Sequence, residues 1–145
     1  MTMKVSHILS SKTGDLVTIT PEQTIKTAVK QLVERNIGAL LVVDDNGNLV
    51  GILSERDIIR WSSQTDDVLK MSVAEVMTRN VVTGLPQDDL MSVANTMTER
   101  RFRHLPIMDG GKLIGIISIG DVLKAQRDKY RGEIDTLETQ LMADK

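Results

Sequence analysis

Apolar residues recur with two different periods along the first half of this chain. A short β-branched run at 17–19 predicts a strand. Apolar residues then recur three and four positions apart over 25–32, which predicts an amphipathic helix with Thr24 at its N-cap. The continuous apolar run at 39–43 has the length of a strand and predicts one that is covered on both faces.

A hairpin and a second helix follow. Turn-forming residues at 45–48 separate the run at 39–43 from another apolar run at 49–53, which predicts two antiparallel strands. Ser54 follows directly and is a typical N-cap for the helix predicted over the next residues. The first half of the chain is therefore predicted to run strand, helix, strand, strand, helix.

The second half is predicted to repeat this order. A β-branched run at 81–83 predicts a strand, and an apolar stripe within 90–97 predicts a helix. The runs at 104–108 and 113–117 predict a hairpin whose tip is the Gly-Gly pair at 110–111. A polar connector joins the two halves.

The residues themselves confirm an internal repeat. Segment 49–60 returns as 113–124, with its glycine, serine and aspartate in register, and most other positions are identical or conservatively changed. A repeat of this period predicts a pair of equivalent units, so any site is expected to be paired or to lie between them. We expect one repeat unit at 1–63, a second at 64–125 and a C-terminal amphipathic helix at 126–145.

The C-terminal segment carries a narrow apolar stripe. Tyr130, Ile134, Leu137 and Leu141 are spaced four, three and four residues apart, with charged residues between them. This spacing is typical of a helix that packs along a single seam. The seam could pack back on its own chain or pair with another copy, and the narrow stripe and terminal position slightly favour an oligomer contact.

Composition narrows the function classes. The chain has 145 residues, a formal net charge of −2 and no cysteine. A general polyanion binder would be strongly basic, and a single-strand nucleic-acid binder would need more than the one Trp, one Tyr and one Phe found here. No run of residues is long and apolar enough to span a membrane. We expect a cytoplasmic protein without disulfides.

The repeated Ser-x-x-Asp element is the first candidate site. Ser54 and Asp57 in one half match Ser118 and Asp121 in the other. A serine N-cap followed by an acidic residue resembles a capping box, which is the commoner explanation of such a pattern. The same helix start could also bind a ligand, because its free amides attract phosphate and an aspartate can accept both hydroxyls of a ribose.

The second candidate is the basic segment before the 104–108 strand. Arg103 and His104 align with Gly38 and Ala39 of the first repeat. A charge run at a helix end is usually a solvated face. Two large polar side chains in place of two small ones nevertheless predict an asymmetry, with anion recognition in one half and room for a flat group in the other.

The residues reached so far resemble the cystathionine β-synthase (CBS) domain family, in particular small stand-alone bacterial proteins made of one tandem pair. The motifs that carry this resemblance are 51–57, 76–83, 97–106 and 115–121. It implies an α+β fold of two tandem β-α-β-β-α units with pseudo-twofold symmetry, plus the C-terminal helix. It also implies two clefts that bind AMP, ADP, ATP, NAD(H) or S-adenosylmethionine.

The resemblance assigns residues of this sequence to such a ligand. The ribose hydroxyls would be held by Asp57 and Asp121, and the phosphate by Ser54, Ser118, Arg56, Arg103 and His104. The adenine pocket would be lined by Thr18, Ile19, Thr20, Thr83, Gly84 and Leu85. Room and backbone contacts would come from Ile37, Gly38 and Ala39, with Pro106 in the same site. Because Arg56 aligns with Gly120, and Ile19 with Gly84, we expect the two clefts to be occupied unequally.

These observations predict a non-catalytic sensor of adenine nucleotides, a homodimer that acts through a separate regulated protein. A phosphate-bearing ligand is expected to tie Ser54 and Asp57 to Arg103 and His104. One alternative is a structural interaction module whose Ser-x-x-Asp elements are only helix caps. An enzyme is less favoured, because the sequence shows no metal-ligand cluster and no nucleophile with a base, and no catalytic cofactor is expected.

Overall fold

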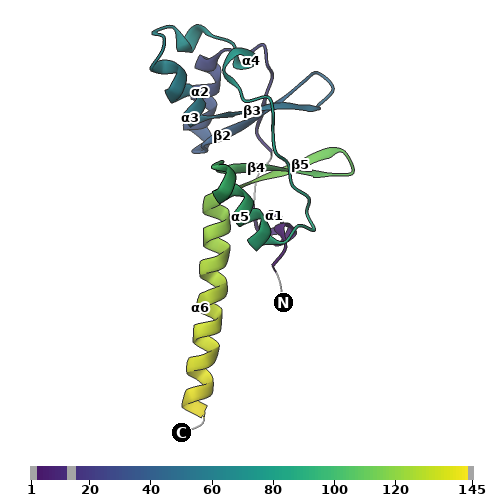
Figure 1. The fold of residues 1–145 in the computed structure, drawn as a ribbon, viewed down its shortest axis with the longest axis vertical. Coiled ribbons are helices and arrows are strands. Elements are labelled where there is room, and N and C mark those ends of the chain that lie inside the picture. The colour runs from purple at the N-terminus through teal and green to yellow at the C-terminus, as the bar shows by residue number, and fades with distance from the viewer. Residues whose placement is uncertain (1–2, 13–15, 144–145) are drawn as a thin grey trace. The chain divides into compact units, whose positions relative to one another are not determined.

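In a computed structural model, which describes residues 3–12 and 16–143, the chain forms two compact units (Figure 1). Unit 1 combines 1–13, 84–105 and 116–145, and unit 2 combines 14–83 and 106–115. The predicted mixed α+β architecture and the C-terminal helix are confirmed. The compact units do not follow the repeat boundaries at 63 and 125, which stay a prediction about the sequence units.

Unit 2 is built on a three-stranded sheet. Strand β1 (Thr18–Ile19) pairs in parallel with β2 (Ala39–Val43), which pairs antiparallel with β3 (Leu49–Ser54). The first four residues of β2 are buried, as the continuous apolar run predicted. In the turn after β2, the Asp44 carboxylate accepts hydrogen bonds from the amides of Asn46 and Asn48, at 3.0 and 2.9 Å.

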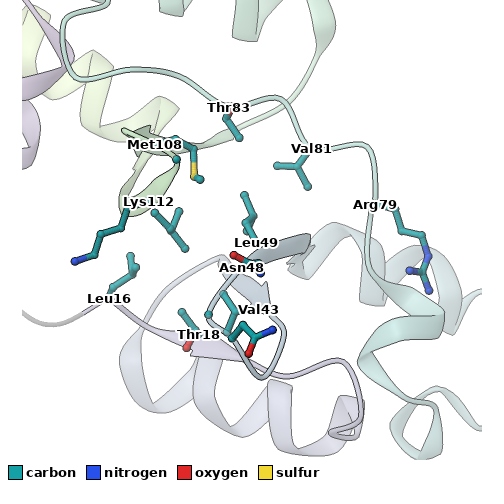
Figure 2. Close-up of a pocket in the computed structure, with 14 residues that line it drawn as sticks. Leu16, Thr18, Val43, Asn48, Leu49, Arg79, Val81, Thr83, Met108 and Lys112 are labelled. Carbon is teal, nitrogen blue, oxygen red and sulfur yellow. The ribbon is translucent and has the colours of Figure 1, made fainter.

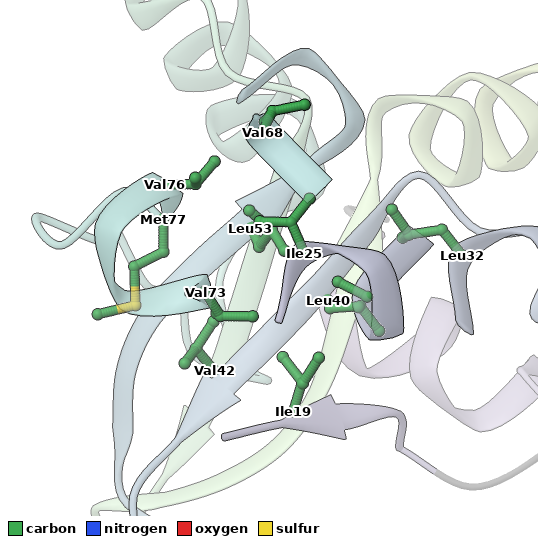
Figure 3. Packing of buried hydrophobic residues seen from close by; sticks show 11 residues of the cluster. Ile19, Ile25, Leu32, Leu40, Val42, Leu53, Val68, Val73, Val76 and Met77 are labelled. Atoms are coloured by element: carbon green, nitrogen blue, oxygen red, sulfur yellow. The ribbon is translucent and has the colours of Figure 1, made fainter. Parts of the chain in front are cut away.

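Three helices and a 3-10 turn complete unit 2, and they are α2 (Ile25–Arg35), α3 (Glu55–Ser62), η1 (Val68–Lys70) and α4 (Val73–Val76). As predicted, Thr24 caps α2 by accepting from the amide of Thr27 at 3.3 Å. Figure 3 shows the core that these elements enclose. Its buried side chains include Ile19, Ile25, Leu40, Val42, Leu53 and Val73.

Unit 1 is helical. It contains α1 (Val5–Ser11), α5 (Leu90–Arg100) and α6 (Ile119–Ala143). The hairpin of β4 (His104–Asp109) and β5 (Lys112–Ser118) has its ends in unit 1 and its tip in unit 2. Gly110 and Gly111 both have positive φ at this tip, so the predicted turn is confirmed.

Each compact unit takes its short leading helix from the other repeat. In unit 1, the amide of Leu90 at the start of α5 donates to the carbonyl of Met3, just before α1, at 2.9 Å. In unit 2, the amide of Ile25 at the start of α2 donates to the carbonyl of Met71, just before α4, at 2.9 Å. Because α1 and α4 each pack in the unit built mainly from the other repeat, the compact units differ from the sequence repeats.

The strand predicted at 81–83 is wrong, because these residues form no strand in the structure. In the first repeat, β1 is anchored by Ile19, which buries its side chain in the core. The aligned residue of the second repeat is Gly84, which has no side chain to bury. Glycine in a strand interior removes packing and costs backbone entropy, so the β-branched run alone does not make a strand here.

Candidate functional site

The first Ser-x-x-Asp element forms a complete capping box at the start of α3. The Ser54 hydroxyl accepts from the amide of Asp57 at 3.2 Å, and the Asp57 carboxylate accepts from the Ser54 amide at 2.9 Å. The Ser54 hydroxyl lies 3.0 Å from the same carboxylate oxygen. The structural explanation of this element as a helix cap is therefore supported by its geometry.

The second oxygen of Asp57 is also engaged. It accepts from the Thr78 hydroxyl at 3.3 Å and lies 3.9 Å from a guanidinium nitrogen of Arg60. Thr78 is held there because its backbone pairs with Ile52 of β3 through hydrogen bonds of 2.9 and 3.0 Å. Asp57 is only 7% exposed, so both of its oxygens are used by the protein itself. Arg56, on the same helix, is exposed.

The second Ser-x-x-Asp element, Ser118 to Asp121, forms the same capping hydrogen bonds at the start of α6, but its aspartate contacts a lysine. The Ser118 amide donates to Asp121 at 2.8 Å, and the Asp121 amide donates to the Ser118 hydroxyl at 3.0 Å. The ammonium of Lys12 donates to the same Asp121 oxygen at 2.9 Å and to the carbonyl of Ile116 at 2.8 Å. The Asp121 side chain keeps 27% of its surface exposed.

Burial raises the pKa of Asp121, but its hydrogen bonds outweigh that effect. The Lys12 ammonium and the Ser118 amide both stabilise the carboxylate, so the pKa of Asp121 lies below its ordinary value. Asp121 is therefore an ionised, partly accessible acceptor at neutral pH. The two Ser-x-x-Asp elements are alike in backbone but unlike in the availability of their carboxylates.

Asp121 lies at the wall of a pocket of about 490 Å³ within unit 1. The pocket is formed by α1 and the residues that flank it on one side, and by the first part of α6 on the other; it is lined by Met3, His7, Ile8, Ser11, Lys12, Asp121, Lys124, Ala125, Asp128 and Lys129. Its volume is that of a typical small-ligand site. The carboxylate can accept ligand hydroxyls, and three lysines can bind an anion.

Sequence reasoning missed the lysines of this pocket. Lys124 aligns with Arg60 of the first repeat, so a cation one turn after each aspartate was a signal in the sequence. Lys12 precedes the first strand and gave no such signal, because only the tertiary structure places it beside Asp121. Lys129 lies in the segment predicted as the C-terminal helix, where the sequence suggested no ligand site.

The residues predicted to bind ligand at the starts of β2 and β4 lie next to the N-termini of α3 and α6, respectively. The Glu55 amide donates to the Gly38 carbonyl at 2.9 Å in unit 2, and the Ile119 amide donates to the Arg103 carbonyl at 2.9 Å in unit 1. Gly38 therefore lies with Ser54, and Arg103 with Ser118. The expectation that Ser54 and Asp57 share a ligand with Arg103 and His104 stays a prediction.

A second pocket, of about 740 Å³, lies within unit 2 (Figure 2). It brings together Thr18 and Thr83, which the family resemblance assigned to the adenine pocket. The other lining residues are Leu16, Val43, Asn46, Gly47, Asn48, Leu49, Arg79, Val81, Met108, Gly111, Lys112 and Leu113. Sequence reasoning missed its two cations, Arg79 and Lys112, because hairpin tips and connectors carry no ligand motif.

The remaining residues that were predicted to bind ligand are not among those that line these two pockets. Ile19 and Ala39 are buried, and Pro106 is buried in β4. The amide of Thr20 donates to the side chain of Gln23 at 3.0 Å, and the amide of Leu85 donates to Asp88 at 2.8 Å. Ile37 and His104 are half-buried, and Gly84 is buried.

Within residues 3–12 and 16–143, no group of three or more histidine and acidic side chains is placed to hold a metal ion. No helix in the same residues has the length and apolar character needed to cross a bilayer.

Comparison with known proteins identifies the family. The CBS domain model matches residues 5–64 and 73–128. The chain belongs to the CBS-domain family and is a tandem CBS pair. A 17.7 kDa protein of Acidianus ambivalens is 36% identical over 90% of this chain and 77% of its own length. The CBS domain-containing protein YhcV of Bacillus subtilis is 35% identical over 81% of this chain and 84% of its own length.

Solved structures agree with this assignment. The CBS-domain protein ATU1752 of Agrobacterium tumefaciens is 39% identical, covers 86% of this chain and 99% of its own, and gives a TM-score of 0.82. The CBS pair of MJ0100, in complex with 5′-methylthioadenosine and S-adenosylmethionine, is 29% identical with a TM-score of 0.79 over 89% and 99% of the two chains. CBSX2, in complex with AMP, is 27% identical with a TM-score of 0.73 over 86% and 97%.

Proposed function

We propose that this CBS pair is a non-catalytic regulatory module that binds a phosphate-bearing adenosine ligand, of the class of AMP, ADP, ATP or NAD(H). Two of its structural neighbours are complexes with adenosine compounds, AMP in one and S-adenosylmethionine with methylthioadenosine in the other. The ligand would come from a cytoplasmic nucleotide pool, and the signal would pass to a separate protein. Its homodimeric state is part of the same proposal.

The observation that carries this proposal is the state of the Asp121 carboxylate. Asp121 is ionised and partly exposed at the wall of the unit 1 pocket, whereas Asp57 is 7% exposed with both oxygens engaged. A ribose diol needs an accessible acceptor. We therefore place the stronger site at Asp121 and assign Asp57 mainly to the α3 cap, which is the unequal occupancy expected from the sequence.

The lysines of the same pocket favour a ligand with phosphate. Lys12, Lys124 and Lys129 face the carboxylates of Asp121 and Asp128, which leaves an excess of one positive charge at neutral pH. This charge attracts a phosphate and disfavours the sulfonium of S-adenosylmethionine. Among adenosine ligands, AMP and its relatives are the best match.

Calorimetric titration of AMP, ATP, NADH and S-adenosylmethionine into the wild type, Asp121→Asn and Asp57→Asn tests the proposal. We expect AMP to bind the wild type, to bind Asp121→Asn at least about tenfold more weakly, and to bind a folded Asp57→Asn nearly as well as the wild type. Equal AMP binding by the wild type and Asp121→Asn would refute the assigned site. No heat with any of the four compounds would refute the function.

The alternative is a structural interaction module that binds no nucleotide. It is favoured by the two capping boxes, which already account for both serines and both aspartates. In that case both Asp→Asn variants lower the melting temperature, and no adenosine compound raises it.

A further inference from the structure

The second half of α6 carries an exposed apolar seam. Tyr130, Ile134, Leu137 and Leu141 are 59, 54, 58 and 65% exposed, respectively. Their spacing of four, three and four residues puts them along one stripe of the helix, at the d, a, d and a positions of a heptad pattern. The alternative in which this seam packs back on its own chain is therefore not supported by the described residues.

The first part of α6, by contrast, is anchored to its own unit. Val122 is buried, and α6 contacts both α5 and α1. The Gln126 amide nitrogen lies 2.8 Å from the sulfur of Met91 on α5. Beyond this anchor the helix continues without interruption to Ala143, as Figure 1 shows. The anchor fixes where the helix begins and in which direction the seam runs.

A helix segment of this kind needs packing to be stable. Gly132 lies in its middle, and a Cβ added there would meet nothing within 4 Å. Glycine in an open helix costs roughly 1 kcal/mol relative to alanine, and most helices in proteins owe their stability to packing of an apolar face. A partner along the seam would supply that packing.

The charges of α6 indicate what the partner is. Before Gly132 the tail is basic, with Lys124, Arg127, Lys129 and Arg131 against one acid, Asp128. After Gly132 it is acidic, with Glu133, Asp135 and Glu138. In the antiparallel orientation that brings the two seams together, Arg131 from the basic part lies close to Glu138 from the acidic part of the second copy. The helix is thus complementary to itself when reversed.

The heptad positions give an antiparallel register and disfavour the parallel orientation. Pairing Ile134 with Leu137 of the second copy also pairs Tyr130 with Leu141, so all four seam residues are covered. In this antiparallel register the flanking Arg131 lies opposite Glu138 of the second copy, twice by symmetry. A parallel pair would instead place Glu133 against Glu138, which are like charges.

We propose that residues 130–141 of α6 form an antiparallel helix pair with the same residues of a second copy. The interface is isologous, so it closes as a dimer and does not propagate. Each dimer buries both seams and forms two Arg131–Glu138 ion pairs. The pair names the interface of the homodimer included in the proposed function, but it does not depend on nucleotide binding, because it rests on the exposure, spacing and charges of α6.

Light scattering with size-exclusion chromatography on the full chain tests the seam. We expect the wild type to be a dimer and Leu137→Glu to raise its dissociation constant by at least about a hundredfold, because a charge would replace a buried leucine. Val33→Glu is the matched control, since Val33 is an exposed apolar residue on α2. A monomeric wild type, or a dimer that Leu137→Glu leaves unchanged, would overturn the proposal.

Disulfide trapping tests the orientation, because the natural chain has no cysteine. We expect Tyr130→Cys mixed with Leu141→Cys to form a cross-linked dimer under mild oxidation, and each variant alone to form none. In a parallel pair each variant would cross-link with itself and the mixture would give no advantage. That result would overturn the antiparallel register, as would the absence of any cross-link in a dimeric protein.

Discussion

The backbone amide of Ile119 donates a hydrogen bond of 2.9 Å to the carbonyl of Arg103. The aligned pair in the first repeat, Glu55 and Gly38, forms the same bond at the same length. The backbone at this point of the repeat is therefore the same in both halves, while the side chains on it differ. This explains how one fold can place Asp57 and Asp121 in equivalent backbone positions with different side-chain partners.

We expect acid to weaken the protein through Asp121. Its pKa is lowered in the folded state by the Lys12 and Ser118 hydrogen bonds, so its ionised form stabilises the fold above the unfolded pKa of about 3.9. That contribution is lost as pH falls through the lowered folded pKa. Urea melts between pH 2 and 6 should show a smaller acid-induced loss in Asp121→Asn than in the wild type, by about 1 kcal/mol. Equal slopes would contradict this prediction.

We expect Thr78→Val to destabilise the protein by about 1 kcal/mol. The change removes the hydroxyl that donates to Asp57 at 3.3 Å and leaves the Ser54–Asp57 capping box in place. Chemical denaturation measures the loss. Thr27→Val is the control and should cost less, because the Thr27 hydroxyl lies 3.2 Å from the Thr24 hydroxyl at an exposed position where water can replace it. A neutral Thr78→Val would mean that the buried Asp57 does not need this donor.

We expect Gly51→Ala to cost about 1–3 kcal/mol, because the new Cβ would lie 2.6 Å from the Met77 sulfur and 3.0 Å from the Thr78 carbonyl. In the structure, the chain segment at Met77 makes this close approach. Thermal unfolding checks the prediction, and an unchanged melting temperature would show that Met77 moves away at little cost.

Gly132→Ala should act in the opposite direction. The added methyl meets nothing within 4 Å, and alanine favours a helix by roughly 1 kcal/mol over glycine. Circular dichroism should show more helix, and the dimer should tighten several-fold because the seam is better ordered before pairing. A weaker dimer would show that Gly132 lies inside the helix contact.

We expect that removing lysines from the unit 1 pocket weakens the binding of phosphate-bearing ligands selectively. Replacing Lys124 and Lys129 by Met should reduce affinity for AMP about tenfold while leaving affinity for adenosine unchanged, because only AMP carries the anion. Lys26→Met removes an exposed lysine from α2 and serves as the control. Equal losses for AMP and adenosine would indicate a damaged pocket and not a phosphate contact.

Much of the local structure was predictable from the sequence. The cap at Thr24, the buried run at 39–43 and the Gly-Gly turn at 110–111 depend on residues close together in the chain, and all three are confirmed. The strand at 81–83 failed for a tertiary reason. Whether a β-branched run becomes a strand depends on what it can bury, and the second repeat has Gly84 where the first has Ile19.

The sequence by itself determined the repeat, the order of its elements apart from the strand at 81–83, the capping serines and the seam of the last helix, because periodicity and caps are local properties. Only the tertiary structure decided which segments form each compact unit, and it placed Lys12 on Asp121 and Thr78 on Asp57. Those pairs are 109 and 21 residues apart in the chain. No local pattern encodes such pairs, since they follow from how the two leading helices exchange between repeats and bury their apolar faces.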